Sequence, residues 1–145
     1  MAAMGMLAIA CLLLLSGCSI LLENPADAPI SISSDNGELR VVVCTSFEAS
    51  EVRMSERSDA GEWSYFWSFV RDIDIAAGDE LSPSLAEELG VGAGRDPKLD
   101  PYDDIRIVLA NGTESVSAQF TVPEAGLPGG EWIHPNGDTT QQPCS

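Results

Sequence analysis

From residue 30 onward, short runs of alternating apolar and polar residues predict strands that bury one face. Ile30-Ser31-Ile32-Ser33 is the first such run, and Leu39–Cys44 follows it. The uninterrupted Val41-Val42-Val43 in the second run is typical of a strand covered on both faces. Asp35-Asn36-Gly37 predicts the turn between them, because asparagine and glycine accept positive φ. Further strands are predicted at Glu51–Arg57 and Trp63–Ile73, with a brief segment around Leu81. Glu131–Ile133 is expected either to add a last strand or to pack as part of the tail before Cys144.

The second half of the chain contains the strongest hairpin signal. Ile105–Leu109 and Val116–Val122 are strand-like runs on either side of Asn111-Gly112, a pair that favours tight hairpin turns. One short helix is predicted between Pro83 and Leu89, with Ser82 as its N-cap.

These elements predict an all-β fold. About seven short strands with almost no helix favour an antiparallel β-sandwich of immunoglobulin-like architecture. A closed barrel is the main alternative. The Cys–Trp–Cys framework of antibody domains is absent, because Cys144 lies in the C-terminal tail, so the likeness concerns architecture alone.

The N-terminal segment has a different pattern. Met6–Leu15 is almost wholly apolar, but it is about half of the ~20 residues that a membrane-crossing helix needs, so it fits the h-region of a signal peptide. Leu15-Ser16-Gly17-Cys18 follows and resembles the lipobox of bacterial lipoprotein precursors. The segment Met1–Gly5 departs from that family's pattern, because it has no Lys or Arg. The alternatives are an ordinary signal peptide, in which Cys18 is incidental, and an N-terminal core helix.

The lipoprotein resemblance implies three parts. Residues 1–17 are a signal peptide cleaved after Gly17, with Leu15, Ser16 and Gly17 recognised by the signal peptidase. Residues 18–29 are a tether whose Cys18 thiol carries a diacylglyceryl group, and residues 30–145 are the β domain. Two acyl chains anchor a protein stably, at ~0.8 kcal/mol per buried methylene. We therefore expect a lipid-anchored protein on the outer side of a bacterial cell membrane.

Charge narrows the choice of partners. All 23 acidic and 7 basic residues follow Gly17, so the mature chain keeps the full formal net charge of −16. A surface this acidic repels phosphate backbones, and we expect no nucleic-acid partner. The mature chain is long enough to bury a core without a structural metal, and its sequence contains no motif for a cofactor.

The cysteines predict one disulfide. Cys11 leaves with the signal peptide and Cys18 is consumed by lipid, so Cys44 and Cys144 remain as a pair in an oxidising compartment. A bond between them would close a loop of about 100 residues, worth at most ~4–5 kcal/mol in the chain-entropy model. Two buried or free thiols are the alternative.

An aspartate-rich loop is a weak candidate for a metal site. Asp96, Asp100, Asp103 and Asp104 lie within ten residues, and hard cations such as calcium prefer several oxygen ligands. The spacing matches no EF-hand loop, and basic residues interrupt the cluster. A solvated loop is the favoured interpretation.

Catalytic chemistry has little support in the sequence. His134 is the single histidine, and no Gly-x-Ser-x-Gly nucleophile motif occurs. Its neighbours Pro135, Asn136 and Gly137 predict an exposed loop histidine. A zinc site would need more His or free Cys residues. We therefore expect that the protein is not an enzyme.

The aromatic residues are weak candidates for a binding surface. Strict alternation predicts that Trp63, Tyr65, Trp67 and Phe69 share one face of a strand, and such a face is more often core than platform. Trp132, close to two glycines, is the favoured exposed aromatic.

Taken together, these features favour a non-catalytic, lipid-anchored envelope protein that binds another envelope component. A solute- or calcium-binding lipoprotein that uses residues 95–104 is one alternative, and a deep pocket would favour it. A small envelope hydrolase is another, and close Ser/His/Asp geometry around His134 would favour that.

Overall fold

The computed structural model describes residues 29–57, 60–82, 93–95 and 97–144. The predicted signal peptide, Cys18, most of the tether and the predicted helix Pro83–Leu89 lie outside these ranges. The described chain forms ten strands: β1 (Ile30–Asp35), β2 (Glu38–Val43), β3 (Phe47–Arg57), β4 (Trp63–Ile75), β5 (Glu80–Leu81), β6 (Ala93–Gly94), β7 (Asp104–Ala110), β8 (Ser115–Thr121), β9 (Trp132–Ile133) and β10 (Thr139–Thr140).

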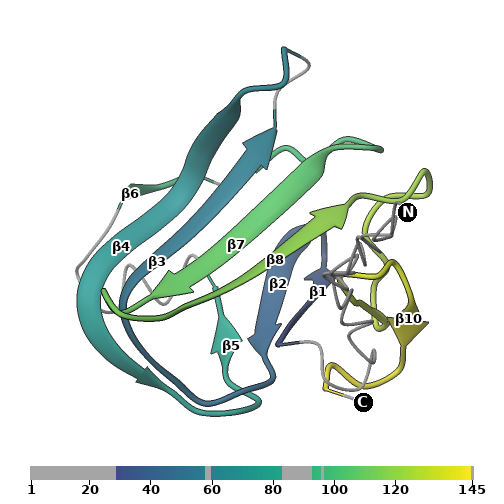
Figure 1. The fold of residues 1–145 in the computed structure, drawn as a ribbon. Helices are drawn as coiled ribbons and strands as arrows, with labels where there is room; N and C mark the ends of the chain where they lie inside the picture. The colour runs from purple at the N-terminus through teal and green to yellow at the C-terminus, as the bar shows by residue number, and fades with distance from the viewer. Residues whose placement is uncertain (1–28, 58–59, 83–92, 96, 145) are drawn as a thin grey trace, which may run out of the picture.

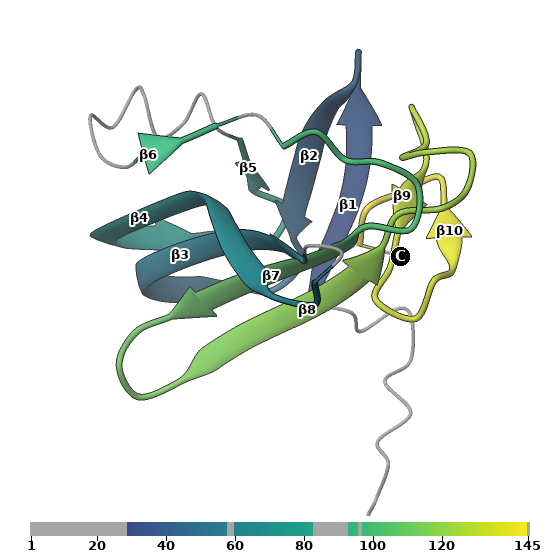
Figure 2. The same ribbon diagram turned by 90° about the horizontal axis from the view of Figure 1, so that it is seen from above.

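The strands form two antiparallel sheets (Figure 1). One sheet has the order β10-β9-β1-β2-β5, and the other has the order β6-β4-β3-β7-β8. Seen from above, the two sheets lie in separate layers (Figure 2). The predicted antiparallel β-sandwich is confirmed. The described strands outnumber the predicted ones because four of them, β5, β6, β9 and β10, are only two residues long.

Two hairpins form where turn residues predicted them. Asn36 and Gly37 connect β1 to β2 with φ values of 51° and 87°, a conformation that costs asparagine and glycine little. The side chain of Asn111 closes the β7–β8 turn, because its Oδ1 accepts the N–H groups of Thr113 at 3.1 Å and Glu114 at 2.9 Å. Both turns therefore fix the register of the strands that they join.

The core lies between the sheets. The valine run of β2 is buried on both faces, as predicted, with Val41, Val42 and Val43 at 1%, 3% and 0% exposure. Alternate residues of β7, namely Ile105, Ile107 and Leu109, are fully buried in the same core cluster as Val41 and Val43. Burial of apolar area is worth about 25 cal/mol per Å², so these residues contribute to the driving force for folding together with the rest of the core.

The C-terminal tail returns to the start of the domain. β9 pairs with β1, β10 pairs with β9, and the Cys44 and Cys144 sulfur atoms form a disulfide with their Cα atoms 5.3 Å apart. The predicted pairing is confirmed. A tail rich in glycine, proline and polar residues is thereby held against the β1 edge.

Strand β4 departs from strict alternation. Met54 lies opposite Trp67 and Ser55 lies opposite Tyr65, so Phe66 is an extra residue in β4, a β-bulge. The bulge changes which residues point inward. Trp67 faces the core at 1% exposure, whereas Tyr65 is 60% exposed on the other side. The prediction that Trp63, Tyr65, Trp67 and Phe69 share one face is therefore wrong.

Candidate functional site

The solvent side of the β4-β3-β7-β8 sheet carries the most distinctive set of side chains. We call this surface the outer face. Its members are the outward-pointing residues from Glu51 to Arg57 of β3 and their neighbours on the paired strands: Glu51, Arg53, Ser55 and Arg57 of β3, Trp63, Tyr65, Ser68 and Val70 of β4, Asp104, Arg106, Val108 and Ala110 of β7, and Ser115, Ser117, Gln119 and Thr121 of β8.

Two arginines of the outer face stack on its two aromatic rings. The Arg106 guanidinium carbon lies 4.0 Å from the centroid of the Trp63 ring, and that of Arg53 lies 5.7 Å from the centroid of Tyr65. Ser55 lies beneath them and is only 4% exposed although it belongs to the solvent side. These large side chains therefore form a packed layer, in which each cation–π contact is worth roughly 0.5–1 kcal/mol at an exposed site.

The three arginines of the outer face differ in their ion pairs. Arg53 donates from Nε to Glu51 Oε1 at 2.5 Å, and this bond raises the pKa of Arg53 above its ordinary value. Arg57 forms an ion pair with Asp104, with Arg57 Nη1 3.5 Å from Asp104 Oδ2. Within the described part of the chain, Arg106 forms no ion pair with a carboxylate.

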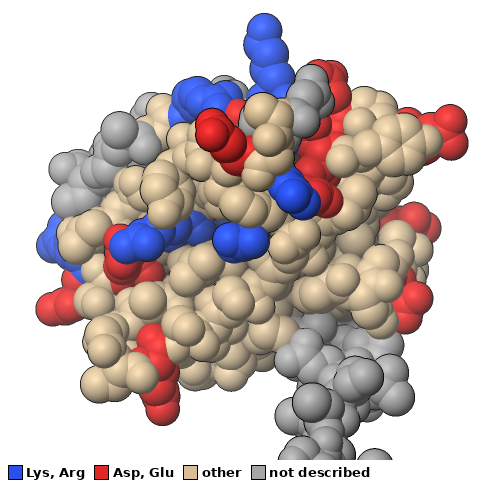
Figure 3. All heavy atoms as spheres, turned by 45° about the horizontal axis from the view of Figure 1, so that its top comes forward, with Lys and Arg blue, Asp and Glu red and all other residues tan. Residues whose placement is uncertain are grey.

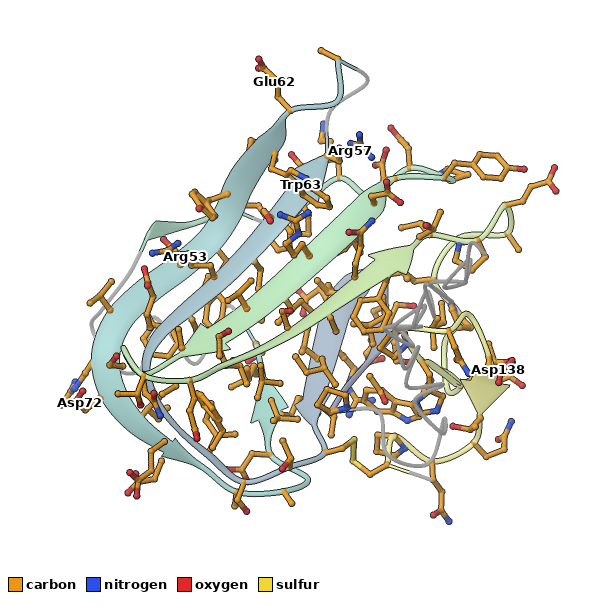
Figure 4. All side chains as sticks on the ribbon, in the orientation of Figure 1. Arg53, Arg57, Glu62, Trp63, Asp72 and Asp138 are labelled. Carbon is orange, nitrogen blue, oxygen red and sulfur yellow. A yellow bond between two sulfur atoms is a disulfide. The ribbon has the colours of Figure 1, made fainter. Side chains whose placement is uncertain are left out.

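The charge of the outer face contrasts with that of the whole chain. Three arginines there meet two carboxylates, in a protein with a formal net charge of −16, while the exposed Glu48 and Asp74 pair farther along the same sheet. Figure 3 shows basic side chains, with acidic ones among them, across one side of the molecule. Figure 4 shows Arg53, Arg57 and Trp63 over β3 and β4. The outer face is therefore a locally basic, aromatic surface on an acidic protein.

The other two tryptophans are structural. Trp67 packs edge-on against Phe69, with ring centroids 5.2 Å apart. Trp132 is 7% exposed, so the prediction that it is the exposed aromatic is wrong. Trp132 lies under Arg40, whose guanidinium carbon is 5.0 Å from the ring and which also donates two hydrogen bonds to Glu80, at 2.8 and 2.6 Å. The tail folds onto β1 beside β2, which covers the ring in a way that local sequence does not indicate.

His134 is buried, with 1% exposure, and the prediction of an exposed loop histidine is wrong. Its Nδ1 lies 3.0 Å from Ser31 Oγ, and its Nε2 lies 2.8 Å from Thr140 Oγ1. The residue directly follows β9, so strand pairing brings its ring between β1 and β10. Burial lowers the pKa of His134, and the negative charge of Asp138 raises it in opposition.

The hydroxyl protons around His134 connect it to the tail. Ser31 donates to the carbonyl of Pro143, and Thr140 donates to the carbonyl of Gln142 at 2.5 Å. Each hydroxyl has a single proton. While Ser31 and Thr140 both donate that proton to the tail carbonyls, each can only accept a hydrogen bond from the His134 ring. A neutral imidazole has one N–H, so when the ring is neutral one of the two hydroxyls must donate to the ring nitrogen instead of to the tail. Ser31 is fully buried and has no access to a substrate, which makes this pair an unsuitable nucleophile and base.

The aspartates of the predicted metal loop have separate partners. Asp103 Oδ2 accepts the Asp100 N–H at 2.7 Å, which closes the loop. Asp104 accepts the Thr121 hydroxyl at 2.7 Å and pairs with Arg57. Asp96 lies outside the described residues. Among those that are described, no three His, Cys, Asp or Glu side chains lie close enough together to hold a metal ion.

Sequence reasoning missed the arginines of the outer face, although a signal was present. Arg53, Ser55 and Arg57 alternate with Val52 and Met54, which places them on one side of β3. Arg106 alternates with the buried isoleucines of β7 in the same way. The pairing of β3 with β7 that brings these positions together has no local sequence signal.

Comparison with protein-family models, curated proteins and solved structures finds no match to this chain. In the ranges described, no helix has the length and apolar character needed to span a membrane.

Proposed function

We propose that this protein is a lipid-anchored module of a bacterial cell envelope that binds another envelope component through its outer face and catalyses no reaction. The observation that carries this proposal is the layer of Trp63, Tyr65, Arg53 and Arg106 on the solvent side of the sheet. Tryptophan, tyrosine and arginine are the residues that most often dominate the energy of protein interfaces. Here the packing of the layer holds them in place before a partner arrives.

The lipid anchor supplies the second part of the mechanism. The lipobox resemblance of Leu15-Ser16-Gly17-Cys18 supports a tether between the membrane and the domain. Confinement to a surface raises the effective concentration of a binding module for any partner held on the same surface. A weak contact through one sheet face is then sufficient for function.

The experiment is in-cell cross-linking followed by pull-down from the envelope. It compares the wild type with Cys18→Ala, which removes the lipid site, and with Arg106→Ala, which removes the guanidinium that stacks on Trp63. The proposal predicts a partner that the wild type captures and that both variants lose. Equal membrane partitioning of the wild type and Cys18→Ala would refute the anchor. Unchanged capture by Arg106→Ala would refute the outer face as the binding surface.

Arg40→Ala is the matched control. Arg40 also stacks on a tryptophan, but it belongs to the other sheet and donates two hydrogen bonds to Glu80. We expect this variant to capture the partner as the wild type does.

A further inference from the structure

The arginines of the outer face are spaced regularly along the strand direction. Arg53 and Arg57 are four residues apart on β3, and Arg106 of β7 lies opposite Ser55, midway between them. Residues two apart in a strand are separated by about 6.7 Å. We call each line of side chains that runs across paired strands a row. The Cα atoms of the three arginines therefore belong to three successive rows on this side of the sheet, and neighbouring rows are about 6.7 Å apart.

This spacing matches an extended polypeptide. Alternate side chains of an extended chain point the same way and repeat at about 6.7 Å. A peptide lying along β3 and β7 with acidic residues at positions i, i+2 and i+4 would therefore place one carboxylate over each row. A guanidinium binds a carboxylate through two parallel N–H···O bonds, which are among the stronger hydrogen bonds in proteins.

Stacking prepares the guanidiniums for such a ligand. A side chain held flat against an aromatic ring has already lost much of the rotamer freedom that binding would otherwise cost. The Trp63 ring is covered by Arg106, so the edge of that guanidinium, rather than the ring face, meets a partner. Tyr65 and Val70, at 60% and 74% exposure, offer apolar contacts beside the arginines.

Charge complementarity indicates the sign of the partner and its orientation. The chain as a whole carries a formal charge of −16 and repels an acidic ligand. The outer face carries three arginines against two carboxylates, so such a ligand meets an excess of positive charge there, and the exposed Glu48 and Asp74 at the far end of the same sheet repel it from that end. Like charges elsewhere disfavour wrong docking, which gives specificity to an otherwise weak contact.

We propose that the outer face binds an acidic polypeptide segment in extended form, with acidic side chains at alternate positions along the three arginine rows. This inference rests on the proposed function and names the chemistry of the partner. Arg106 makes the central contact, because it lies in the middle row and has no carboxylate partner within the described residues.

The test measures binding of three probes to the full-length protein in detergent micelles by fluorescence anisotropy. The first is a labelled peptide that alternates Asp with Thr, and the second has the same composition with its aspartates in one block. The third is polygalacturonate, a carboxylated polysaccharide. We expect the alternating peptide to bind most tightly and to weaken at high salt. Arg106→Ala should raise the Kd of the alternating peptide about tenfold, because it removes one partly desolvated hydrogen bond between charged groups. Arg106→Lys should restore part of the affinity, because it keeps the charge without the planar fork.

Each other outcome has a defined meaning. Equal binding of the alternating and block peptides would refute the row-matched extended pose. Preference for polygalacturonate would replace the peptide with an acidic glycan. If none of the probes binds while the pull-down still depends on Arg106, the acidic-peptide inference fails and the proposed function stands. If the pull-down does not depend on Arg106 either, both fail. Circular dichroism and a urea midpoint equal to that of Arg40→Ala would show that each Arg106 variant is folded.

Discussion

Removal of the Cys44–Cys144 disulfide should destabilise the protein strongly. The two cysteines are 100 residues apart. In the chain-entropy model a loop of this length restricts the unfolded chain by about 4.7 kcal/mol at 25 °C. We expect the double variant Cys44→Ala, Cys144→Ala to lose most of this free energy of unfolding. Residual structure in the unfolded chain makes the figure an upper bound.

Urea denaturation measures this loss. With an m-value of about 2 kcal/mol/M, typical of a small domain, the midpoint should fall by roughly 2 M. Reduction of the wild type should give the same shift, and the alanine variant should not respond to the reductant. An unchanged midpoint would show that the bond does not constrain the unfolded chain and would refute the reasoning.

The remaining predictions concern the buried histidine and the packing around Trp67. Because burial lowers the pKa of His134 from its ordinary value of 6.5, the unfolded chain binds more protons in that range, and the free energy of unfolding should fall as the pH drops from 7.5 through 6. In His134→Gln this part of the pH dependence should disappear from urea midpoints, whereas an unchanged slope would mean that another group causes it. A Cβ atom at Gly94 would lie 2.5 Å from Trp67 Cδ1, so Gly94→Ala should cost about 1–3 kcal/mol by overpacking, while Gly129→Ala, whose nearest neighbour is 3.8 Å away, should cost much less. Equal thermal midpoints for the two glycine variants would contradict the tight packing at Trp67.

Much of the fold could be predicted because its signals are local. The turns at Asn36-Gly37 and Asn111-Gly112 require positive φ, and the valine run of β2 indicates a strand covered on both faces. The disulfide was predicted by counting the cysteines that would remain if the predicted signal peptide were cleaved and Cys18 carried lipid. Each of these inferences needed only neighbouring residues or the composition.

The errors share a physical cause, which is that side-chain exposure depended on distant parts of the chain. The bulge at Phe66 arises from the pairing of β4 with β3, and it moved Trp67 into the core and left Tyr65 outside. Trp132 and His134 are buried because the tail returns to β1. The rows of arginines likewise depend on the register between β3 and β7, so periodicity alone could place each arginine outward but could not bring them together.

Binding through the outer face is tested by capture of the proposed envelope partner with wild type, Arg106→Ala and Arg40→Ala, after folding and membrane partitioning of each protein have been compared. The account predicts that Arg106→Ala loses the partner while Arg40→Ala, with its arginine stacked on Trp132 of the opposite sheet, captures it like the wild type. Loss of capture by Arg40→Ala with full capture by Arg106→Ala would place the binding surface on the other sheet and contradict the account.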